Sequence, residues 1–269
     1  MDHSATRRFY DELAAGYDLL YADWSAGIAA QGAALDRLIT GVSGSGAYDV
    51  LDCACGIGTQ AIGLASRGHR VTGTDLSPVA AARAAREAAA RGLRLATEAA
   101  DMRALPFRDA SFDVVVCADN SLPHLLTPAD VLAALGEMRR VLRPGGLLLL
   151  STRPYDRLRR ERPRATPPQV HAGPEGRVIT FQLWHWHADG ERYDLELFQL
   201  RPEGMKGTKG ADEDGWTTQV HRATYWALTQ DETAGFATRA GFADVTWHDP
   251  DDTGFFQPLL TARAARSGA

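Results

Sequence analysis

Three aspartates stand at the ends of runs that have the composition of β-strands: Asp52, Asp75 and Asp101. Asp52 opens a Gly-rich turn that includes Gly56 and Gly58. Glycines directly after a parallel strand let a ligand approach the backbone closely, and the helix that follows offers free N–H groups. Because ligands of open α/β sheets bind at the carboxyl ends of the strands, this pattern predicts a cofactor site at that edge of a sheet.

The glycine turn has two competing interpretations as a nucleotide site. Gly56-x-Gly58-x-x-Ala61 fits a dinucleotide fingerprint loosely, and Asp75 could accept hydrogen bonds from ribose hydroxyls in either case. A carboxylate such as Asp52 is unfavourable beside a pyrophosphate. It is favourable beside the ammonium and sulfonium groups of S-adenosylmethionine, which carries no phosphate. The acid therefore favours S-adenosylmethionine over a nicotinamide dinucleotide, and a turn that binds no ligand is the remaining alternative.

Alternating strands and helices would bring these aspartates to one edge of the sheet. Two helix starts are indicated by the pairs Ser77-Pro78 and Thr127-Pro128, since a capping hydroxyl followed by proline is typical of a first turn. The strands expected around the helices are residues 49–53, 70–75, 93–100, 112–118 and 147–152. Five strands separated by helical segments indicate a doubly wound α/β sheet.

The pattern changes after Arg153. A segment rich in proline and arginine leads into strand-like runs at 178–187, 192–200 and 216–228, with a polar loop at 201–215 that we expect to be mobile. We expect these runs to form an antiparallel insertion. Thr229 and Glu232 then form a capping box that opens a helix ending at Gly241. Two last strands are expected at 242–247 and 255–262.

Several short segments resemble, in the same order along the chain, the motifs of class I S-adenosylmethionine-dependent methyltransferases. They are Val50–Gly58, Thr74–Ser77, Ala100–Met102, Leu105–Phe107, Ser111–Asp113 and Arg143–Gly146. The resemblance covers roughly residues 9–153. Within this class the chain resembles the glycine N-methyltransferases and glycine/sarcosine methyltransferases, and three further segments carry that likeness: Tyr17–Trp24, Asn120–Leu125 and Arg153–Asp156.

The resemblance implies a Rossmann-like methyltransferase fold, with a doubly wound, mostly parallel, seven-stranded sheet and an antiparallel insertion after the fifth strand. Residues 1–269 would form a single domain. Its expected parts are an N-terminal helical lid (1–45), a cofactor-binding core (46–152), an inserted antiparallel segment on the substrate side (153–228) and the final helix and strands of the core sheet (229–269).

The resemblance also implies S-adenosylmethionine as the cofactor and assigns its contacts. The backbone at Ala54 and Gly56 would hold the methionine part, within a turn that also includes Asp52 and Gly58. Asp75 would bind the ribose hydroxyls. The adenine would meet Leu76, Asp101 and Met102, and the carbonyl of Ala118 would lie near the ammonium. Tyr17 and Trp24 would close over the cofactor, although Trp24 could instead be a helix-packing aromatic residue.

For the acceptor, the resemblance implies contacts with Asn120 after the fourth strand and Arg153 after the fifth. A guanidinium suits bidentate binding of a carboxylate, whereas the alternative for Arg153 is a solvated side chain. His124 is a candidate general base, or it holds its own loop. Tyr21 and Tyr225 would lie near the acceptor, and Tyr225 could instead form a cross-strand aromatic pair. The candidate catalytic residues are thus Asn120, His124 and Tyr21.

Two features depart from the glycine/sarcosine pattern. That group tends to carry an arginine shortly after the position of Trp24, where this chain has Ala29-Ala30-Gln31. The inserted strands carry Trp184, Trp186 and Trp216, which could wall a pocket for an acceptor larger than glycine. His185 and His187 have a spacing that can ligate a metal, but no carboxylate or cysteine follows at a matching short interval, so no metal is expected.

Composition excludes several classes of protein. The 269 residues carry a net charge of −5, which argues against nucleic acid as a partner. No apolar run approaches the length of a membrane span, and the polar start at residues 1–10 lacks the core of a secretion signal, so we expect a cytoplasmic protein. Three cysteines in apolar runs favour reduced thiols.

These observations favour a methyltransferase that acts on a small polar molecule, with the nitrogen of an amino acid or amine as the preferred acceptor. The alternative is O-methylation of a hydroxyl or carboxyl group in a natural product. More remote alternatives are a cofactor-binding module without catalysis and an NAD-dependent oxidoreductase. The sequence does not identify the acceptor, the number of methyl transfers or the oligomeric state.

Overall fold

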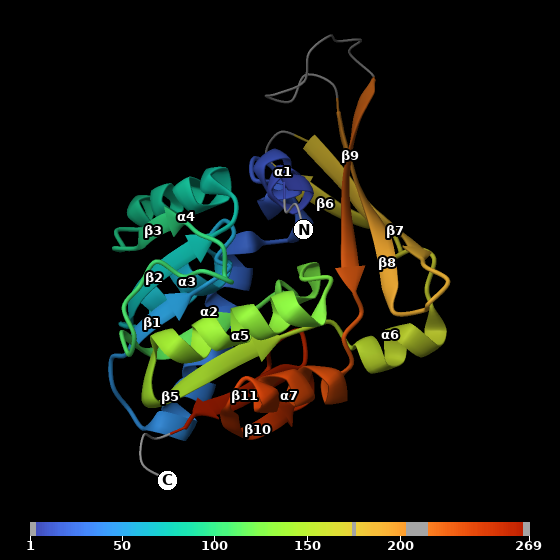
Figure 1. Cartoon of the computed structure of the whole chain (residues 1–269). Coiled ribbons are helices and arrows are strands. Elements are labelled where there is room, and N and C mark those ends of the chain that lie inside the picture. Colours follow the sequence, from blue (N-terminus) through green and yellow to red (C-terminus); the bar gives the residue numbers. More distant parts are fainter. Residues whose placement is uncertain (1–3, 174–175, 203–214, 266–269) are drawn as a thin grey trace.

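Seven strands form the central sheet of the computed structural model, which describes residues 4–173, 176–202 and 215–265 (Figure 1). They lie in the order β10-β11-β5-β4-β1-β2-β3. Their bounds are β1 Asp49–Asp52, β2 Arg70–Asp75, β3 Ala96–Ala99, β4 Phe112–Cys117, β5 Leu142–Ser151, β10 Phe242–His248 and β11 Leu259–Ala264. Strands β1 to β5 pair in parallel, and β11 is antiparallel to β5 and β10. The predicted doubly wound, mostly parallel sheet is confirmed.

Helices cover both faces of this sheet. One face packs against α2 Trp24–Ser43, α3 Thr59–Ala65 and α4 Pro78–Ala90, and the other against α5 Pro128–Val141 and α7 Gln230–Arg239. Successive residues of β4 therefore enter opposite cores: Val114 and Val116 pack with the first group of helices, and Val115 and Cys117 with the second. A strand that is covered on both faces has to be apolar throughout, as β4 is.

The predicted helix caps are present. The Ser77 hydroxyl accepts from the backbone N–H of Ala80 at 3.0 Å, and Pro78 occupies the first turn of α4. At the start of α7, Thr229 and Glu232 form the complete capping box, in which each side chain accepts from the other residue's backbone N–H. These local hydrogen bonds satisfy donors that a helix leaves free at its first turn.

Close packing of α2 on α3 depends on a pair of glycines. A Cβ atom at Gly32 would lie 2.5 Å from the backbone of Gly63, and one at Gly63 would lie 2.6 Å from the carbonyl oxygen of Ile28. No side chain fits at such distances, so both positions require glycine. The contact fixes α3, whose N-terminus borders the turn after β1.

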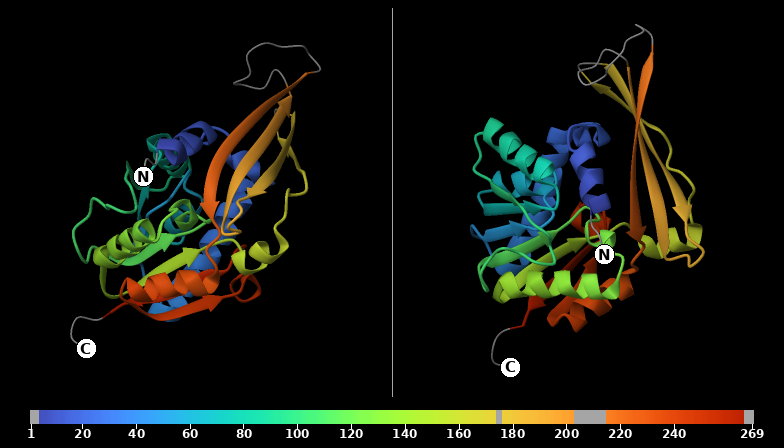
Figure 2. Two further views of the ribbon diagram at one scale, coloured as in Figure 1. Left: turned by 45° about the vertical axis from the view of Figure 1, so that its right-hand side comes forward. Right: turned by 45° about the horizontal axis from the view of Figure 1, so that its top comes forward.

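Four antiparallel strands form a second sheet between β5 and α7, where the insertion was predicted. They are β6 Gln169–Gly173, β7 Gly176–Trp186, β8 Arg192–Pro202 and β9 Trp216–Trp226. Both views in Figure 2 show this sheet standing beside the central sheet rather than extending it. Its inner face buries a cluster that includes Trp184, Tyr193 and Leu197 together with Phe9 and Leu13 of α1 (Ser4–Leu13).

The N-terminal segment joins the two sheets. After α1 it forms η1 (Tyr17–Leu20) and then α2. Asp11 accepts from the Ser77 hydroxyl at 2.5 Å, and Arg83 of α4 donates to Asp18 at 2.8 Å. From the other side, Gln199 of β8 donates to the backbone carbonyl of Gly16 at 2.9 Å. The segment is thus anchored over the carboxyl ends of the parallel strands.

Several element boundaries differ from those expected. β5 begins at Leu142 rather than 147, because it pairs with Phe112 before a register shift and so includes the Arg-Pro-Gly-Gly turn. β3 and β11 begin later than expected, at Ala96 and Leu259; before β11 the chain forms the short helix α8, Pro250–Thr253. The Pro- and Arg-rich segment contains α6 (Tyr155–Glu161) and β6, which were missed because it shows no clear apolar periodicity. Most of the polar loop at 201–215 lies outside the described residues.

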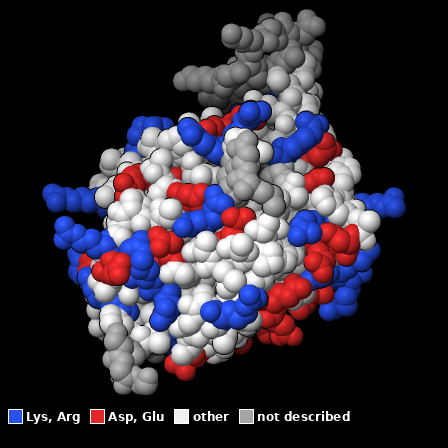
Figure 3. All heavy atoms as spheres, in the orientation of Figure 1, with Lys and Arg blue, Asp and Glu red and all other residues white. Residues whose placement is uncertain are grey.

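The surface offers no large area of one charge in the view of Figure 3, where basic and acidic side chains are interspersed. No helix in the described ranges is both long and apolar enough to cross a membrane. The Nε2 atom of His185 lies 3.3 Å from Oε2 of Glu196, and the Nε2 atom of His187 lies 3.1 Å from Oδ2 of Asp194. Among the described residues, no three His, Cys, Asp or Glu side chains are placed to hold a metal ion.

Candidate active site

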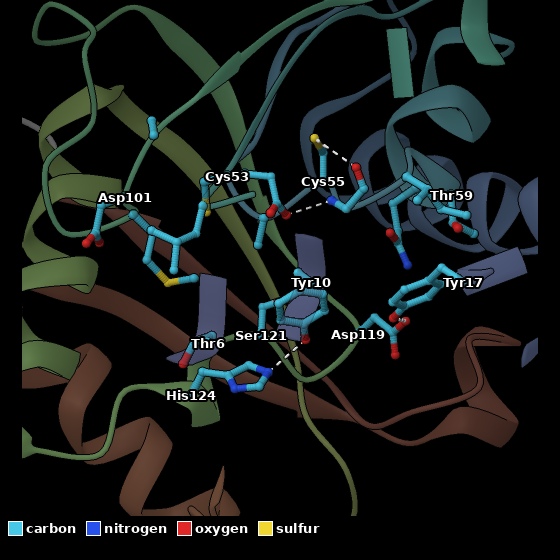
Figure 4. A pocket seen from close by; sticks show the side chains of 18 of the residues that line it. Thr6, Tyr10, Tyr17, Cys53, Cys55, Thr59, Asp101, Asp119, Ser121 and His124 are labelled. Carbon is cyan, nitrogen blue, oxygen red and sulfur yellow. Dashed lines mark hydrogen bonds between the residues drawn. The ribbon is translucent and has the colours of Figure 1, made fainter. Parts of the chain in front are cut away.

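A cavity of about 760 Å³ opens at the carboxyl ends of β1, β2 and β4 (Figure 4). Seven residues predicted to contact a cofactor line it: Tyr17, Ala54, Gly56, Asp75, Leu76, Asp101 and Met102. Asp75, Asp101 and Asp119 contribute carboxylates, and no lysine or arginine is among its described lining residues. The cavity therefore suits a ligand that carries positive charge and does not suit a pyrophosphate.

The glycine turn after β1 is shaped by Asp75. One carboxylate oxygen of Asp75 accepts from the N–H of Gly56 and the other from the N–H of Ser77, both at 2.8 Å. Gly58 has a φ of 99°, and a Cβ atom there would lie 2.9 Å from the side chain of Ile62. Burial raises the pKa of Asp75 to about 6, although the two N–H groups oppose that shift. Each oxygen keeps a lone pair for a hydroxyl donor.

Asp52 lies behind the cavity rather than in its lining. Its side chain is 1% exposed, and one oxygen accepts from the N–H of Ala54 at 3.4 Å. The other oxygen, Oδ2, has no hydrogen-bond partner among the described residues. Burial, together with the charge of nearby Asp75, raises the pKa of this carboxyl to about 7. Asp52 thus adds negative potential under the turn when it is ionised.

Asp101 borders the cavity but already has a partner. The guanidinium of Arg103 donates to both Asp101 oxygens, at 2.6 Å to Oδ2 and 3.0 Å to Oδ1. Arg103 also contacts Asp130 at the start of α5. A ligand amino group would therefore share the Asp101 carboxylate with an arginine, a feature that the sequence did not reveal.

Tyr17 and Trp24, which were both expected over the cofactor, lie in different environments. Tyr17 borders the cavity (Figure 4). Trp24 is not among the lining residues; its indole N–H donates to the hydroxyl of Thr59 at 2.8 Å, and its ring lies beside Arg83 and Arg91. The structure thus corrects the expected position of Trp24 and agrees with the helix-packing alternative.

Two other predicted residues, Gly58 and Ala118, also lie outside the lining. The Oγ of Ser121 donates to the carbonyl of Ala118 at 2.8 Å. The α1 helix supplies two lining residues that the sequence did not predict, Thr6 and Tyr10. Their positions follow from the docking of α1 on both sheets, which no local sequence pattern encodes.

A second, smaller cavity of about 380 Å³ adjoins the first. It is bordered by three predicted acceptor residues, Asn120, Arg153 and Tyr225. Tyr10, Tyr17 and Asp119 border both cavities, so they form the boundary between the two spaces. The structure thus brings together side chains from α1, η1, β9 and the loops after β4 and β5.

Arg153 is held among neutral groups. Its guanidinium donates to the Tyr193 hydroxyl at 2.8 Å and to the Gln182 side-chain oxygen at 3.4 Å. Its cationic carbon lies 4.8 Å from the ring centre of Trp184 and 5.3 Å from that of Tyr225. The solvated alternative for Arg153 is therefore wrong. These contacts orient the guanidinium without neutralising its charge.

The remaining predicted residues surround the boundary between the cavities. Asn120 is 3% exposed, and its side-chain oxygen accepts from the N–H of Arg153 at 3.1 Å. His124 lies 2.7 Å from the Tyr10 hydroxyl through Nε2, and its ring packs on Tyr225 at 4.2 Å. Tyr21 is outside both linings, with its ring 6.5 Å from that of Tyr17.

Asp119 is a further residue of the site that sequence analysis missed, and the one with a charge that borders both cavities. The Tyr17 hydroxyl donates to its Oδ2 at 3.2 Å, as Figure 4 shows, and Gln257 donates to Oδ1 at 3.4 Å. Asp119 and Asn120 both have positive φ, at 53° and 65°. Consecutive left-handed residues other than glycine are uncommon and concentrate at functional sites. The Asp-Asn pair after a buried strand was the available signal.

The tryptophans of the insertion do not wall either cavity. Trp184 lies behind Arg153 and stacks on Tyr193 at 4.6 Å. The Trp186 indole donates to the carbonyl of Pro163 at 3.1 Å, and Trp216 is 38% exposed. None of the three is among the described lining residues. The expectation of a large aromatic pocket is therefore wrong.

Comparison with known proteins identifies relatives of this chain. Residues 50–146 match a family model described as a methyltransferase domain. A glycine/sarcosine N-methyltransferase of Parasynechococcus marenigrum (strain WH8102) is 42% identical over 190 residues, which are 66% of this chain and 66% of that protein. The match spans about two thirds of the length of that relative and about half of the length of two other curated relatives, at 45% and 47%.

Two solved structures share the fold over most of their length. A sugar N-methyltransferase from Streptoalloteichus sp. ATCC 53650 has a TM-score of 0.72 at 22% identity, covering 93% of each chain. An amino pentose methyltransferase of Micromonospora echinaspora, involved in calicheamicin biosynthesis and bound to S-adenosylmethionine, has a TM-score of 0.68 at 21% identity. That match covers 88% of this chain and 92% of the other. At these identities the likeness describes the fold alone.

Proposed function

The chain belongs to the class I S-adenosylmethionine-dependent methyltransferases, and from this premise we propose that it methylates the nitrogen of a small carboxylated amine such as an amino acid. The observation that carries the proposal is Arg153. It is a guanidinium at the smaller cavity whose described hydrogen-bond partners are neutral. Leaving such a charge uncompensated is costly, so a carboxylate on the acceptor would stabilise it.

The larger cavity fits the cofactor of this family. When bound, S-adenosylmethionine supplies a methyl group activated on a sulfonium. Asp75 would accept from the ribose hydroxyls with the lone pairs that the Gly56 and Ser77 N–H groups leave free. The backbone at Ala54 would hold the methionine part, and Leu76, Asp101 and Met102 would border the adenine. The acidic lining, without described lysine or arginine, suits a cofactor that carries positive charge.

The protein's part in methyl transfer is to orient the acceptor and exclude water. Arg153 would hold the carboxylate of the acceptor through its free donor positions, while Asn120 fixes the backbone at Arg153. Tyr10 and Tyr17, which border both cavities, would close the reaction space from the N-terminal side. The acceptor cavity, about 380 Å³ with its open mouth included, is half the size of the cofactor cavity measured in the same way, which supports a small acceptor.

The sequence relative also supports nitrogen as the acceptor atom, since the glycine/sarcosine enzyme, at 42% identity, is named for N-methylation. O-methylation is the competing function. Acceptors that carry a hydroxyl group in place of the amine distinguish O-methylation from N-methylation. Family membership argues against the earlier alternative of an NAD-dependent oxidoreductase.

The test is transfer of a labelled methyl group from S-adenosylmethionine to glycine, sarcosine and β-alanine, to their hydroxy analogue glycolate, and to phenols. We expect label on the amino acids. Label on glycolate or phenols alone would replace the proposal with O-methylation. Absence of label on any amine would refute it, provided that calorimetry shows S-adenosylhomocysteine bound to the same preparation.

A further inference from the structure

The acceptor cavity is bordered by two groups of opposite charge that are not paired with each other. Asp119 and Arg153 both line it. Neither forms an ion pair within 4.0 Å among the described residues. Both lie in a poorly solvated environment, where an unpaired charge is costly. A ligand that carried one charge of each sign would pair both.

The structure keeps the two charges apart. Arg153 donates to Tyr193 and Gln182, and its own backbone N–H donates to Asn120. Asp119 is fixed from a different direction, since its backbone N–H donates to the Ser151 hydroxyl at 2.8 Å and its carboxylate accepts from Tyr17. These contacts hold both side chains at the cavity wall, where they do not form an ion pair with each other.

The backbone at Asp119 also points to a function. Asp119 and Asn120 adopt the left-handed conformation consecutively, with φ of 53° and 65°. A single non-glycine residue in this region costs free energy, and two in succession persist when the surroundings enforce them. Here the conformation turns the Asp119 carboxylate toward the boundary between the cofactor and acceptor cavities.

We propose that Asp119 binds the ammonium group of the acceptor while Arg153 binds its carboxylate, so that the site selects zwitterionic amino acids. This inference rests on the proposed function. It also sets the direction of the acceptor. Because Asp119 borders both cavities and Arg153 only the smaller one, the nitrogen lies at the boundary with the cofactor cavity and the carboxylate away from it.

The same carboxylate accounts for the proton that an ammonium must lose before it can attack carbon. One N–H bond of the ammonium breaks, its electron pair stays on nitrogen, and the proton bonds to an Asp119 oxygen. The neutral amine is then the nucleophile, and Asp119 later returns the proton to solvent. Burial raises the pKa of Asp119 to about 6, opposed by Arg153, which makes it a stronger base than an exposed aspartate.

Several titratable groups lie near Asp119. Asp75, whose pKa burial also raises to about 6, and His124 line the larger cavity together with Asp119. Tyr10, Tyr17, Tyr21 and Tyr225 face Asp119 from α1, η1, the residue after η1 and β9, and burial, the main cause, raises the pKa of each of these tyrosines. They stay protonated at neutral and acidic pH. Arg153 stays charged over the same range. Asp119 and Asp75 are therefore both expected to titrate near pH 6, and the Asp119→Asn variant separates their contributions.

The test compares the Asp119→Asn variant with the wild type on three matched acceptors: glycine, glycolate without the ammonium, and methylamine without the carboxylate. We expect the wild type to prefer glycine over both. In Asp119→Asn, kcat/KM for glycine should fall about 30-fold or more, the usual effect of removing one partner of a buried charge pair. The part of the fall in wild-type kcat/KM near pH 6 that is due to Asp119 should be absent from the variant, so the pH profile of the variant should be flatter there.

A binding measurement does not depend on turnover. Calorimetry should detect glycine binding to the wild-type complex with S-adenosylhomocysteine and much weaker binding to the Asp119→Asn complex. The matched control is Asp244→Asn, because Asp244 also has a positive φ, at 52°. Asp244 is exposed on β10 and lines neither cavity. Thermal melting of both variants shows whether each is folded, and Asp119→Glu, which restores a carboxylate, should recover part of the activity.

Two outcomes overturn the inference and leave the proposed function standing: equal kcat/KM for glycine in Asp119→Asn and the wild type, or a wild type that methylates methylamine as well as glycine. Loss of activity in a folded Asp119→Asn variant without loss of glycine binding would also overturn the ammonium contact. A wild type that methylates no amine refutes the proposed function itself, before any variant is compared.

Discussion

The two cavities are built in different ways. The larger one is lined mainly by residues that follow consecutive parallel strands, such as Gly56 after β1 and Asp75 at the end of β2. The smaller one combines residues from α1, the second sheet and the loops after β4 and β5. The cavity proposed to hold the cofactor is therefore part of the sheet topology itself. The cavity proposed to hold the acceptor adds residues of α1 and the second sheet to the carboxyl ends of β4 and β5.

The cavities also differ in their electrostatics. The larger one has carboxylates and no described lysine or arginine in its lining, with Asp52 buried behind it. The smaller one has Arg153 facing Asp119. This difference suggests a cofactor that carries positive charge and an acceptor that carries both signs. Substitutions of single charged residues can therefore test the two cavities separately.

The largest effect is expected at Asp75. Asp75→Ala removes the acceptor of the Gly56 and Ser77 N–H bonds as well as the expected ribose contact, so the turn loses its shape and its ligand. We expect affinity for S-adenosylhomocysteine, measured by calorimetry, to fall roughly 100-fold or more. Glu98→Ala on the neighbouring strand β3 is the control, because Glu98 is exposed. Retained affinity in Asp75→Ala would refute the ribose role.

A smaller and more selective effect is expected at Arg153. Arg153→Lys keeps the charge but cannot reproduce the guanidinium geometry, so KM for glycine should rise roughly 10-fold to 100-fold while KM for the cofactor changes little. Arg157→Lys, at an exposed position in α6, should change neither constant. Equal increases in both constants would show that Arg153 supports the fold of the site rather than the acceptor.

Asp52 should affect stability more than binding geometry. Its folded-state pKa of about 7 lies above the ordinary aspartate value near 3.9, so the folded chain binds this proton more tightly than the unfolded chain. The stability contributed by protonation is fully present below about pH 4 and is lost as the pH rises through 7. Asp52→Asn should therefore be more stable than the wild type at pH 8, by roughly 1–4 kcal/mol, with a smaller difference at pH 5.5.

Urea unfolding of both proteins at the two pH values measures this difference directly, because the other titrating groups are common to both. Asp244→Asn, at an exposed position, should equal the wild type at each pH. If Asp52→Asn is less stable than the wild type at pH 8, the carboxylate has a stabilising partner and the pKa argument is wrong.

The smallest effect is expected at Trp24. Trp24→Phe removes the hydrogen bond to Thr59 but keeps an aromatic ring in the helix contact, so unfolding free energy should fall by about 1 kcal/mol. Affinity for S-adenosylhomocysteine should stay within about 3-fold of the wild type, because Trp24 does not line the cavity. A large loss of affinity would show that Trp24 does contribute to cofactor binding, as the sequence analysis expected.

The sequence by itself determined the central sheet and predicted many residues that line the larger cavity. Apolar runs, hydroxyl caps and the glycine turn are local patterns, and parallel strands bring their carboxyl ends to one edge whatever the rest of the chain does. Seven of the eleven predicted cofactor residues accordingly line the larger cavity. The exceptions are Asp52, Gly58, Ala118 and Trp24, which lie one layer behind it or elsewhere.

Only the tertiary structure decided the acceptor side. Asp119 and Arg153 follow the adjacent parallel strands β4 and β5, but Tyr10 joins them only because α1 docks between two sheets, and such docking depends on packing between segments that are far apart in the chain. The sequence predicted Arg153 by likeness but could not show that its partners are neutral, and it gave Asp119 no role. Charge, burial and the absence of a pairing partner are properties of three-dimensional surroundings, so they became visible only when the layers were assembled.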